Sequence, residues 1–327
     1  MKVLMLSGIF AQTPEYRATH MAETPDSLLA DGLRRAGVDV TTAAPHFRGD
    51  WSGYDVVHLN HLMNACARSL VTPRARVVFT PHFSGWKPLH HRIALRATER
   101  RADRVVVFTE DERRRLGGRI PERKVAVIRN ALDVQHFSAA QRVAPQPGEP
   151  WELLYVGQLV EFKRVHLALR LLQALRHGGQ RAVLRVVSHR ETLRPELEAE
   201  AERLGVDDAV EYLGARDRAG VGAEMRRAHL LVLPSYREGQ STVAGEAIIS
   251  ALPVHMFDVA AACEQVPAGY ELPATDEVDR WIDLGVERLA RYGAVAEAFE
   301  RHAPVERELL SLDRAVREHI DLYRSLL

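Results

Sequence analysis

Short apolar segments alternate with amphipathic segments along most of this chain, and that alternation restricts the fold more than any other feature of the sequence. Apolar runs of strand length lie at residues 3–6, 38–42, 56–59, 76–79, 105–109, 125–128, 153–156, 182–187, 210–213, 230–233 and 254–257. Helices are expected between many of them, at residues 27–36, 89–102, 110–116, 165–176, 191–204, 224–228 and from residue 242 onward. Strands that alternate with helices typically build a parallel sheet. The sequence therefore predicts an α/β protein.

The alternating pattern is interrupted at residues 138–150. This stretch has no hydrophobic periodicity and contains Pro145, Pro147 and Pro150, as exposed linkers between domains do. Because 327 residues are about twice the usual domain length, we expect two Rossmann-like, doubly wound domains, at residues 1–145 and 146–305. Ligands of such sheets bind beyond the carboxyl ends of the strands, so a site is expected in a cleft that the two domains face. The tail is expected to be helical.

The composition excludes several classes of protein. With 46% hydrophobic and 27% charged residues, it is that of an ordinary globular chain. The opening apolar run ends too early for a signal peptide, and no later run reaches the roughly 20 apolar residues of a membrane span. Cys66 and Cys263 suggest neither a disulfide framework nor a metal knuckle. We expect a cytoplasmic protein without a nucleic-acid partner; the sequence leaves its oligomeric state open.

Charge is balanced over the whole chain but not within it. The chain holds 44 basic and 44 acidic side chains, whereas residues 1–150 hold 22 basic and 15 acidic ones. This excess favours an anionic acceptor or a peripheral contact with an anionic membrane, or it reflects solvated arginines alone.

The strongest sign of a binding site is a strand, a turn and a helix at residues 230–247. Gly239 permits a tight turn, and Ser241 is a suitable N-cap, so the amides of Thr242 and Val243 would face an anion at the start of the helix.

Two glutamates flank the start of this helix. Glu238 precedes it and Glu246 lies inside it. Because eight residues make about two helical turns, both carboxylates are expected on one side, where they would hold hydroxyl groups. The alternative is that both face solvent and only favour the helix dipole.

A second constellation joins a strand to a helix at residues 155–164. Gly157 permits a ligand to approach the backbone closely, and Lys163 stands at the expected start of the helix. A positive charge there opposes the helix dipole, which a bound anion would explain. A surface lysine without a ligand is the alternative.

Together these two segments resemble the family-4-type retaining glycosyltransferases, or glycosyl transferases group 1, which have the two-domain GT-B fold. The resemblance is strongest at residues 154–253, where the family's Gly-(Arg)-Leu-x-x-x-Lys and Glu-x7-Glu patterns match the segments from Gly157 to Lys163 and from Glu238 to Glu246. Further matches are Ile128-Arg129-Asn130-Ala131-Leu132-Asp133, Ala102-Asp103-Arg104-Val105 and Asp321-Leu322-Tyr323-Arg324. In this family the last helix, here residues 306–327, crosses back to the N-terminal domain.

The resemblance implies a site for a nucleotide-diphosphate sugar in the C-terminal domain. Lys163 would neutralise the diphosphate, Glu238 would hold hydroxyls of the donor sugar, and Glu246 would hold the ribose. The implied donor-binding residues are Gly157, Gln158, Lys163, Glu238, Gly239, Gln240, Ser241, Thr242, Val243 and Glu246.

A histidine in the N-terminal domain completes the catalytic set that the resemblance implies. His82, in Thr80-Pro81-His82-Phe83, matches the family's histidine that approaches the transferred sugar from the acceptor side. The expected catalytic residues are therefore His82, Glu238 and Lys163. A hydrogen-bonded histidine at a strand end is the other interpretation of His82. Gly8, Tyr16 and Arg17 are also expected on the acceptor side.

The chain departs from the family pattern at three places. Gln158 stands where the family has an arginine on the diphosphate, the loop at residues 10–16 lacks the usual Gly-Gly, and Ala260-Ala261 replaces another Gly-Gly. These departures motivate an alternative, a binding or scaffold protein that has lost catalysis. An epimerase or a phosphorylase of the same fold would need side-chain patterns that the sequence does not show.

The resemblance implies transfer of a hexose-type sugar to an acceptor hydroxyl with retention of the anomeric configuration. It implies neither metal nor cofactor, because basic residues and helix ends stabilise the leaving diphosphate. His58, His61, His90 and His91 have spacings that can bind a transition metal, but no third type of ligand clusters beside them. The sequence specifies neither the acceptor nor the base and sugar of the donor.

Overall fold

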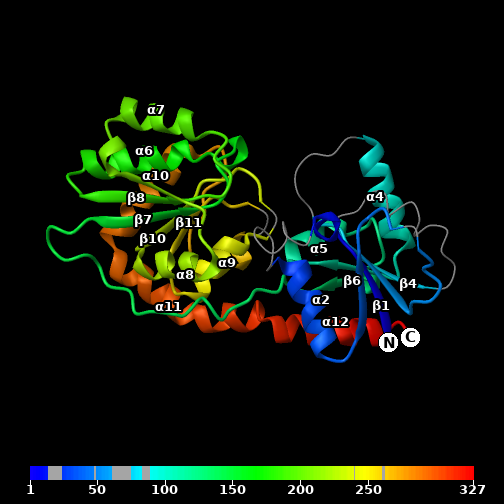
Figure 1. Ribbon diagram of the computed structural model, residues 1–327. Helices are drawn as coiled ribbons and strands as arrows, with labels where there is room; N and C mark the ends of the chain where they lie inside the picture. Colours follow the sequence, from blue (N-terminus) through cyan, green and yellow to red (C-terminus); the bar gives the residue numbers. More distant parts are fainter. Residues whose placement is uncertain (14–23, 48, 61–74, 83–88, 239, 260–261) are drawn as a thin grey trace. The chain divides into compact units, whose positions relative to one another are not determined.

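The computed structural model describes residues 1–13, 24–47, 49–60, 75–82, 89–238, 240–259 and 262–327. Its contacts divide the chain into two compact units, one of Met1–Asp133 with Leu309–Leu327 and one of Val134–Glu308 (Figure 1). Each unit contains a parallel sheet flanked by helices, so the predicted α/β architecture is confirmed.

The sheet of the first unit has six strands in the order β2-β1-β3-β4-β5-β6. The strands are β1 (Lys2–Leu6), β2 (Asp39–Ala43), β3 (Val56–Asn60), β4 (Arg76–Thr80), β5 (Arg104–Val107) and β6 (Val125–Val127). The helices that the structure describes in this unit are η1 (Gly8–Ala11), α2 (Pro25–Arg35), α4 (Leu89–Arg101), α5 (Glu110–Leu116), η2 (Glu122–Lys124) and α12 (Leu312–Arg324). The strand order changes direction between β1 and β3, so the switch point of this sheet lies at the carboxyl ends of these two strands.

The pleat of β1 shows how the sheet buries both faces. Leu4 and Leu6 join a core with Leu116 of α5, whereas Val3 and Met5 join a core with residues of α2 and α12. Successive side chains of a strand point to opposite faces, so a continuous apolar run predicts burial on both sides.

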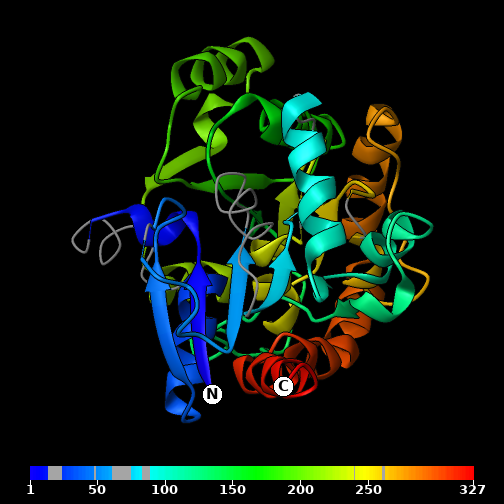
Figure 2. The ribbon, with the colours of Figure 1, turned by 90° about the vertical axis from the view of Figure 1, so that its right-hand side faces the viewer.

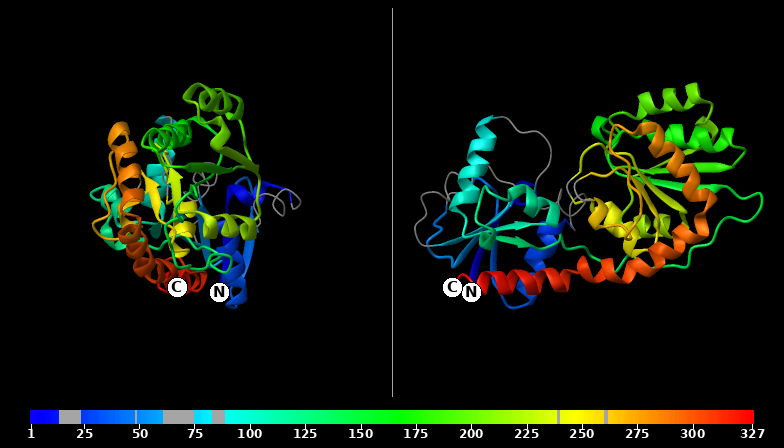
Figure 3. Two further views of the ribbon diagram at one scale, coloured as in Figure 1. Left: turned by 90° about the vertical axis from the view of Figure 1, so that its left-hand side faces the viewer. Right: turned by 180° about the vertical axis from the view of Figure 1, so that it is seen from behind.

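Helix α12 belongs to the first unit although it ends the chain. It packs against α2, where a Cβ on Gly32 would lie 2.5 Å from a methyl carbon of Val316, so only glycine allows this close approach. Tyr323 is fully buried, and its hydroxyl lies 2.7 Å from His58 Nδ1 of β3. As a result, the two chain ends lie side by side in this unit (Figures 1, 2 and 3).

The sheet of the second unit has five strands in the order β11-β10-β7-β8-β9. The strands are β7 (Trp151–Val156), β8 (Ala182–Val187), β9 (Val210–Gly214), β10 (Leu230–Leu233) and β11 (Val254–Met256). The helices described here are η3 (Glu161–Lys163), α6 (His166–His177), α7 (Arg194–Leu204), η4 (Asp207–Ala209), α8 (Arg218–Arg227), α9 (Thr242–Ile249), η5 (Ala262–Glu264), α10 (Val278–Ala290) and α11 (Tyr292–Leu309). Helices α6, α7 and α10 cover one face of this sheet, and α8 and α9 cover the other (Figures 1 and 3).

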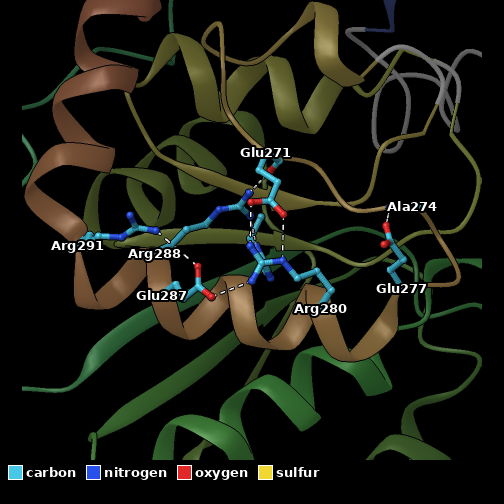
Figure 4. Close-up of polar contacts among 8 residues, drawn as sticks. Glu271, Ala274, Glu277, Arg280, Glu287, Arg288 and Arg291 are labelled. Atoms are coloured by element: carbon cyan, nitrogen blue, oxygen red, sulfur yellow. Dashed lines mark hydrogen bonds and ion pairs between the residues drawn. The ribbon is translucent and has the colours of Figure 1, made fainter.

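Arginines of α10 join this helix to the segment that precedes it (Figure 4). Arg280 donates hydrogen bonds of 2.9 and 2.8 Å to the two carboxylate oxygens of Glu271 and one of 2.8 Å to Glu287. Arg288 is 5% exposed; it donates to the Glu271 carbonyl and lies 4.1 Å over the Tyr270 ring. Exposed ion pairs contribute little to stability, so the buried Arg288 does more to hold α10 in place.

Most of the predicted linker is exposed, and Arg142 is its buried residue. By its contacts the whole segment belongs to the second unit, which begins at Val134. Arg142 is 8% exposed, and its guanidinium donates to the carbonyls of Met225, Arg226, Ala228 and Ser250 at 2.8, 3.0, 2.9 and 2.7 Å. These carbonyls lie at the ends of α8 and α9, where backbone oxygens have no partner within the helix. The segment is mostly exposed, as its prolines indicated, and the buried Arg142 side chain helps to attach it to the second unit.

The helical tail divides among α10, α11 and α12, and the boundary between the units falls at residue 308, near the end of α11. Of the helices that the structure describes, none combines the length and the apolar character needed to cross a lipid bilayer.

Replacement of Arg142 by methionine is expected to destabilise the second unit by about 3 kcal/mol, because it leaves several helix-end carbonyls without a donor in a buried place. Urea unfolding of the full chain measures this difference. Gln141→Met is the matched control, because Gln141 is the exposed neighbour. Equal unfolding midpoints for the two variants would show that Arg142 does not hold the segment.

Candidate functional site

The candidate donor site forms at the switch point of the second sheet. Strand β7 lies beside β10, and both run in parallel, so the loops that follow them leave the same edge. The loops also bind each other: the Tyr236 amide donates to the Phe162 carbonyl at 3.1 Å, and Arg164 Nε donates to the Pro234 carbonyl at 2.9 Å. Two segments about 75 residues apart in the sequence are thereby joined.

Lys163 and Glu238 meet at this junction. Lys163 Nζ donates to Glu238 Oε1 at 2.6 Å, and their side chains are 18% and 12% exposed. Lys163 ends η3 and does not stand in the first turn of α6, which begins at His166. The argument from the dipole of that helix was therefore wrong, and the lysine is held by a carboxylate from the other loop.

Gly157 has a structural role beside the one that the sequence suggested. Tyr155 is fully buried and donates to the Gln158 carbonyl at 2.8 Å, and a Cβ on Gly157 would lie 2.9 Å from its hydroxyl oxygen. Burial, with a smaller effect of the Glu238 charge, raises the pKa of Tyr155, so this hydroxyl stays protonated. The Gln158 side chain lies 3.4 Å from the His189 ring.

The start of α9 is built as the sequence predicted. Ser241 is its N-cap, and Ser241 Oγ accepts a hydrogen bond from the Ala244 amide at 3.3 Å. Thr242 and Val243 form the first turn and are partly exposed, while Gln240 is buried. Gly239 lies outside the described residues.

Glu246 contacts a cation that the sequence did not single out. Its Oε1 lies 3.1 Å from Nη1 of Arg218, the first residue of α8, and Arg218 in turn lies 5.1 Å over the Phe137 ring. The argument that placed Glu238 and Glu246 two helical turns apart was wrong, because α9 begins only at Thr242. Helix α8 begins earlier than predicted, with Asp217 as its N-cap and Arg218 as its first residue. An aspartate is a favoured N-cap residue, so Asp217 could have indicated from the sequence that a helix begins at Arg218.

In the first unit, His82 stands just beyond β4 in an unusual backbone conformation. Its φ is +43°, a left-handed value that costs on the order of 1 kcal/mol in residues other than glycine. The ring packs edge-on against Phe108 with centroids 4.8 Å apart, and Nε2 lies 3.8 Å from Asp26 Oδ1.

Asp26 was not identified from the sequence, where it looks like an ordinary acid in the first turn of a helix. Ser7 Oγ donates to its Oδ2. Burial raises the pKa of Asp26 to about 6, although the hydrogen bond from Ser7 acts in the opposite direction.

A cavity of about 270 Å³ opens at this carboxyl group. It is lined by Ser7, Gly8, Ile9, Thr24, Pro25, Asp26, His82 and Asn130. The structure thus brings His82 and Gly8, both expected on the acceptor side, to one cavity. Tyr16 and Arg17 lie outside the described residues.

The histidine pairs that suggested a metal have other surroundings where the structure describes them. Both ring nitrogens of His58 lie 2.7 Å from hydroxyl oxygens, those of Tyr323 and Thr80. Burial lowers the pKa of His58, and it lowers the pKa of His319, stacked on it, to about 4. His61 and the side chains of His90 and His91 are not among the described parts of the structure. Among the described residues, no group of three His, Cys, Asp or Glu side chains could hold a metal ion.

Family models match both halves of the chain. One for glycosyl transferases group 1 matches residues 151–286, and one for glycosyltransferase family 4 matches residues 46–136. The first range contains the candidate donor residues and the second contains His82.

Named relatives share part of the sequence. A glycogen synthase of Mycobacterium tuberculosis strain CDC 1551 is 33% identical over 146 residues, which are 45% of this chain and 34% of the relative. A D-inositol 3-phosphate glycosyltransferase of Mycobacterium avium strain 104 is 27% identical over 233 residues, which are 68% of this chain and 55% of the relative. The chain thus spans from a third to about half the length of these relatives.

Solved structures share the fold over nearly the whole chain. Anabaena HepE, in complex with UDP and glucose, has a TM-score of 0.74 at 15% identity and covers 99% of this chain and 100% of its own. Sucrose-phosphate synthase of Thermosynechococcus elongatus has a TM-score of 0.79 at 16% identity, with 100% and 99% covered. At such identities the likeness establishes the GT-B fold alone.

The buried carboxyl group of Asp26 makes stability depend on pH. Its pKa is raised from 3.8 to about 6, so ionisation disfavours the folded state: this cost is absent below about pH 4 and is fully present above about pH 6. Asp26→Asn is therefore expected to stabilise the protein at pH 7.5 by about 1 to 3 kcal/mol and to have little effect at pH 4. Thermal unfolding at both pH values measures the difference.

Asp31→Asn is the control for this measurement, because Asp31 lies on the same helix with a side chain 57% exposed. If Asp26→Asn lowered the melting temperature at pH 7.5, the burial cost assigned to the carboxylate would be wrong.

Proposed function

The chain belongs to the family-4-type glycosyltransferases of the GT-B fold, and from that membership we propose that it transfers a sugar from a nucleotide-diphosphate sugar to an acceptor hydroxyl with retention of configuration. The observation that carries the proposal is the contact of 2.6 Å between Lys163 and Glu238 at the switch point of the second sheet. Both residues occupy the family's motif positions, and their loops meet where nucleotides bind in doubly wound folds.

Lys163 is the proposed partner of the diphosphate. Its charge is compensated by Glu238 in the structure, which positions the ammonium group in a half-buried place. A phosphate oxygen would take part of this coordination when the donor binds, and charge that grows on the leaving diphosphate would be met by the same ammonium. Glu238 would then accept hydrogen bonds from hydroxyls of the sugar.

The start of α9 offers further donors to the same phosphates. Its first turn contains no acidic residue, and the amides of Thr242 and Val243 stand at the positive end of the helix dipole. Glu246 is the proposed partner of the ribose hydroxyls. Its ion pair with Arg218 would fix the carboxylate before the ligand arrives.

In the proposed reaction the acceptor oxygen forms a bond to the anomeric carbon while the bond from that carbon to the diphosphate oxygen breaks. The proton of the acceptor hydroxyl passes to an oxygen of the leaving diphosphate. His82, with Gly8, would stand on the acceptor side. Because Lys163 and the helix amides stabilise the leaving group, we propose that the enzyme needs neither a metal ion nor a cofactor.

Nucleotide sugars are expected to raise the melting temperature of the wild-type protein, because a ligand that binds only the folded state stabilises it. UDP-glucose is the first probe, since the fold neighbour HepE is described in complex with it, and other nucleotide sugars complete the panel. Lys163→Ala is expected to lower donor affinity about 10- to 100-fold and so to remove most of the shift.

Arg170→Ala controls for the loss of a positive charge, because Arg170 lies on the neighbouring α6 and pairs with the 92% exposed Asp279. An equal shift in Lys163→Ala and wild type would refute the diphosphate role. A donor that binds tightly but is never turned over with any acceptor would favour the catalytically impaired binding protein instead.

Turnover is expected to preserve the configuration of the anomeric carbon and to continue in the presence of EDTA. Proton NMR of the product distinguishes axial from equatorial linkage through the coupling of the anomeric proton. Glu238→Gln should reduce kcat/KM about 100-fold. Glu198→Gln is the control, because Glu198 is an exposed glutamate of α7 whose replacement should leave kcat/KM unchanged. An inverted product would exclude the proposed mechanism, and loss of activity with EDTA would exclude metal independence.

A further inference from the structure

Arg164 links three segments of the second unit with one side chain. It lies in the loop after β7; its Nε donates to the Pro234 carbonyl, in the loop after β10, at 2.9 Å, and its Nη1 donates to the Thr275 carbonyl, between β11 and α10, at 2.8 Å. Strands β7, β10 and β11 are consecutive in the parallel sheet, so the chain leaves all three at the same edge. Two of the joined segments carry Lys163 and Glu238.

The guanidinium group also rests on a buried aromatic side chain. Its Cζ lies 4.3 Å from the centre of the Phe257 ring, directly after β11, and Phe257 is fully buried and stacks on Trp281 of α10. A planar guanidinium can stack on an aromatic face and donate hydrogen bonds from its edge at the same time, which the ammonium group of a lysine does not reproduce. These contacts therefore favour arginine over any other cation at this position.

The backbone of Arg164 has a conformation that favours glycine. Its φ is +46°, and it is the left-handed residue that ends η3, directly after Lys163. The Arg164 amide donates to the Glu161 carbonyl at 3.0 Å. A side chain at such a position adds strain, which persists only where the surrounding contacts enforce it. Replacement by glycine would thus remove the side-chain contacts without opposing the backbone conformation.

These contacts lie close in the sequence to the ion pair of the candidate donor site. Lys163 directly precedes Arg164, and Glu238 lies four residues after Pro234. Lys163 Nζ and Glu238 Oε1 lie 2.6 Å apart, a spacing that holds only while the two loops stay together. Because a displacement of about 1 Å at a functional group can weaken catalysis strongly, a residue that fixes such a spacing affects function without touching the ligand.

We propose that Arg164 is a positioning residue, which sets the spacing between Lys163 and Glu238 by joining the segments that follow β7, β10 and β11. The roles of Lys163 and Glu238 toward a donor rest on the proposed function, whereas the spacing of the pair does not. Arg164 thus acts through these two residues and not on the donor itself.

The pair can be tested without a ligand, by the rate at which N-hydroxysuccinimide acetate acetylates Lys163. Glu238 holds this ammonium group and its side chain is 18% exposed, so acetylation of wild type should be slow. Arg164→Gly is expected to raise the rate about 5-fold or more, because the loops that hold the pair are no longer joined. Mass spectrometry follows Lys163, with exposed Lys2 as internal reference and Arg170→Ala as control for a lost positive charge.

Donor affinity measures the consequence for function. Calorimetric titration with UDP-glucose, or with the nucleotide sugar of the panel that stabilises wild type most, should show an affinity about 10-fold lower for Arg164→Gly. Arg164→Lys, which keeps the charge without the planar group, should be intermediate in both measurements. In turnover, KM for the donor should rise while KM for the acceptor stays unchanged, a split that a general loss of stability would not produce. Melting temperatures show whether each variant is folded.

Two results would overturn this role of Arg164. They are an equal rate of Lys163 acetylation in Arg164→Gly and wild type, and an equal donor affinity of the two proteins. If Arg164→Gly did not fold, Arg164→Lys would decide by the same measurements. Wild-type values for Arg164→Lys would show that a positive charge is enough and that the guanidinium group positions nothing.

Failure of the positioning role is distinguishable from failure of the proposed function. If wild type bound no nucleotide sugar, the proposed function would fail, and Lys163 acetylation would still decide on Arg164. If wild type bound a donor through Lys163 but Arg164→Gly changed neither measurement, the role of Arg164 alone would fail.

Discussion

The pairing of β7 with β10 is the constraint on which the candidate donor site depends. Parallel strands that lie side by side end at the same edge of the sheet, so the loops that follow them meet however far apart they are in the sequence. Here that geometry brings Lys163 within 2.6 Å of Glu238. The same rule operates in the first unit, where Ser7 follows β1, Asn60 ends β3 and His82 follows β4. Each candidate site is therefore a consequence of strand order.

Buried charged groups have opposite effects in the two units. Arg142 is buried but satisfied, because four helix-end carbonyls accept its hydrogen bonds, so it joins an irregular segment to the second unit. Asp26 is buried with one hydrogen bond from Ser7 and an imidazole 3.8 Å away, and its ionised form is disfavoured. The ionised Asp26 carboxylate therefore lowers the stability of the first unit, whereas Arg142 joins a segment to the second unit.

Sequence patterns singled out most residues of the candidate donor site, but the structural reasons given for some of them were wrong. Ser241 was recognisable as an N-cap because capping depends on local chemistry alone. The structure places Lys163 in contact with Glu238. The helix-based reasons for singling out both residues were wrong, because η3 and the loop before α9 displace the helix starts by a few residues. Arg218 and Asp26 were not found. Their partners, Glu246 and His82, are 28 and 56 positions away, and no local pattern encodes such contacts.

By itself, the sequence determined the class of the fold, the position of most strands and helices and the family, since alternating apolar runs and motif spacing are properties of neighbouring residues. Only the tertiary structure decided which side chains meet. It showed that residues 134–145 belong to the second unit, that Glu246 is paired with Arg218, and that Asp26 lies 3.8 Å from His82 in the lining of one cavity. The physical reason is that burial and charge pairing depend on atoms brought together by folding, and a linear pattern does not contain those distances.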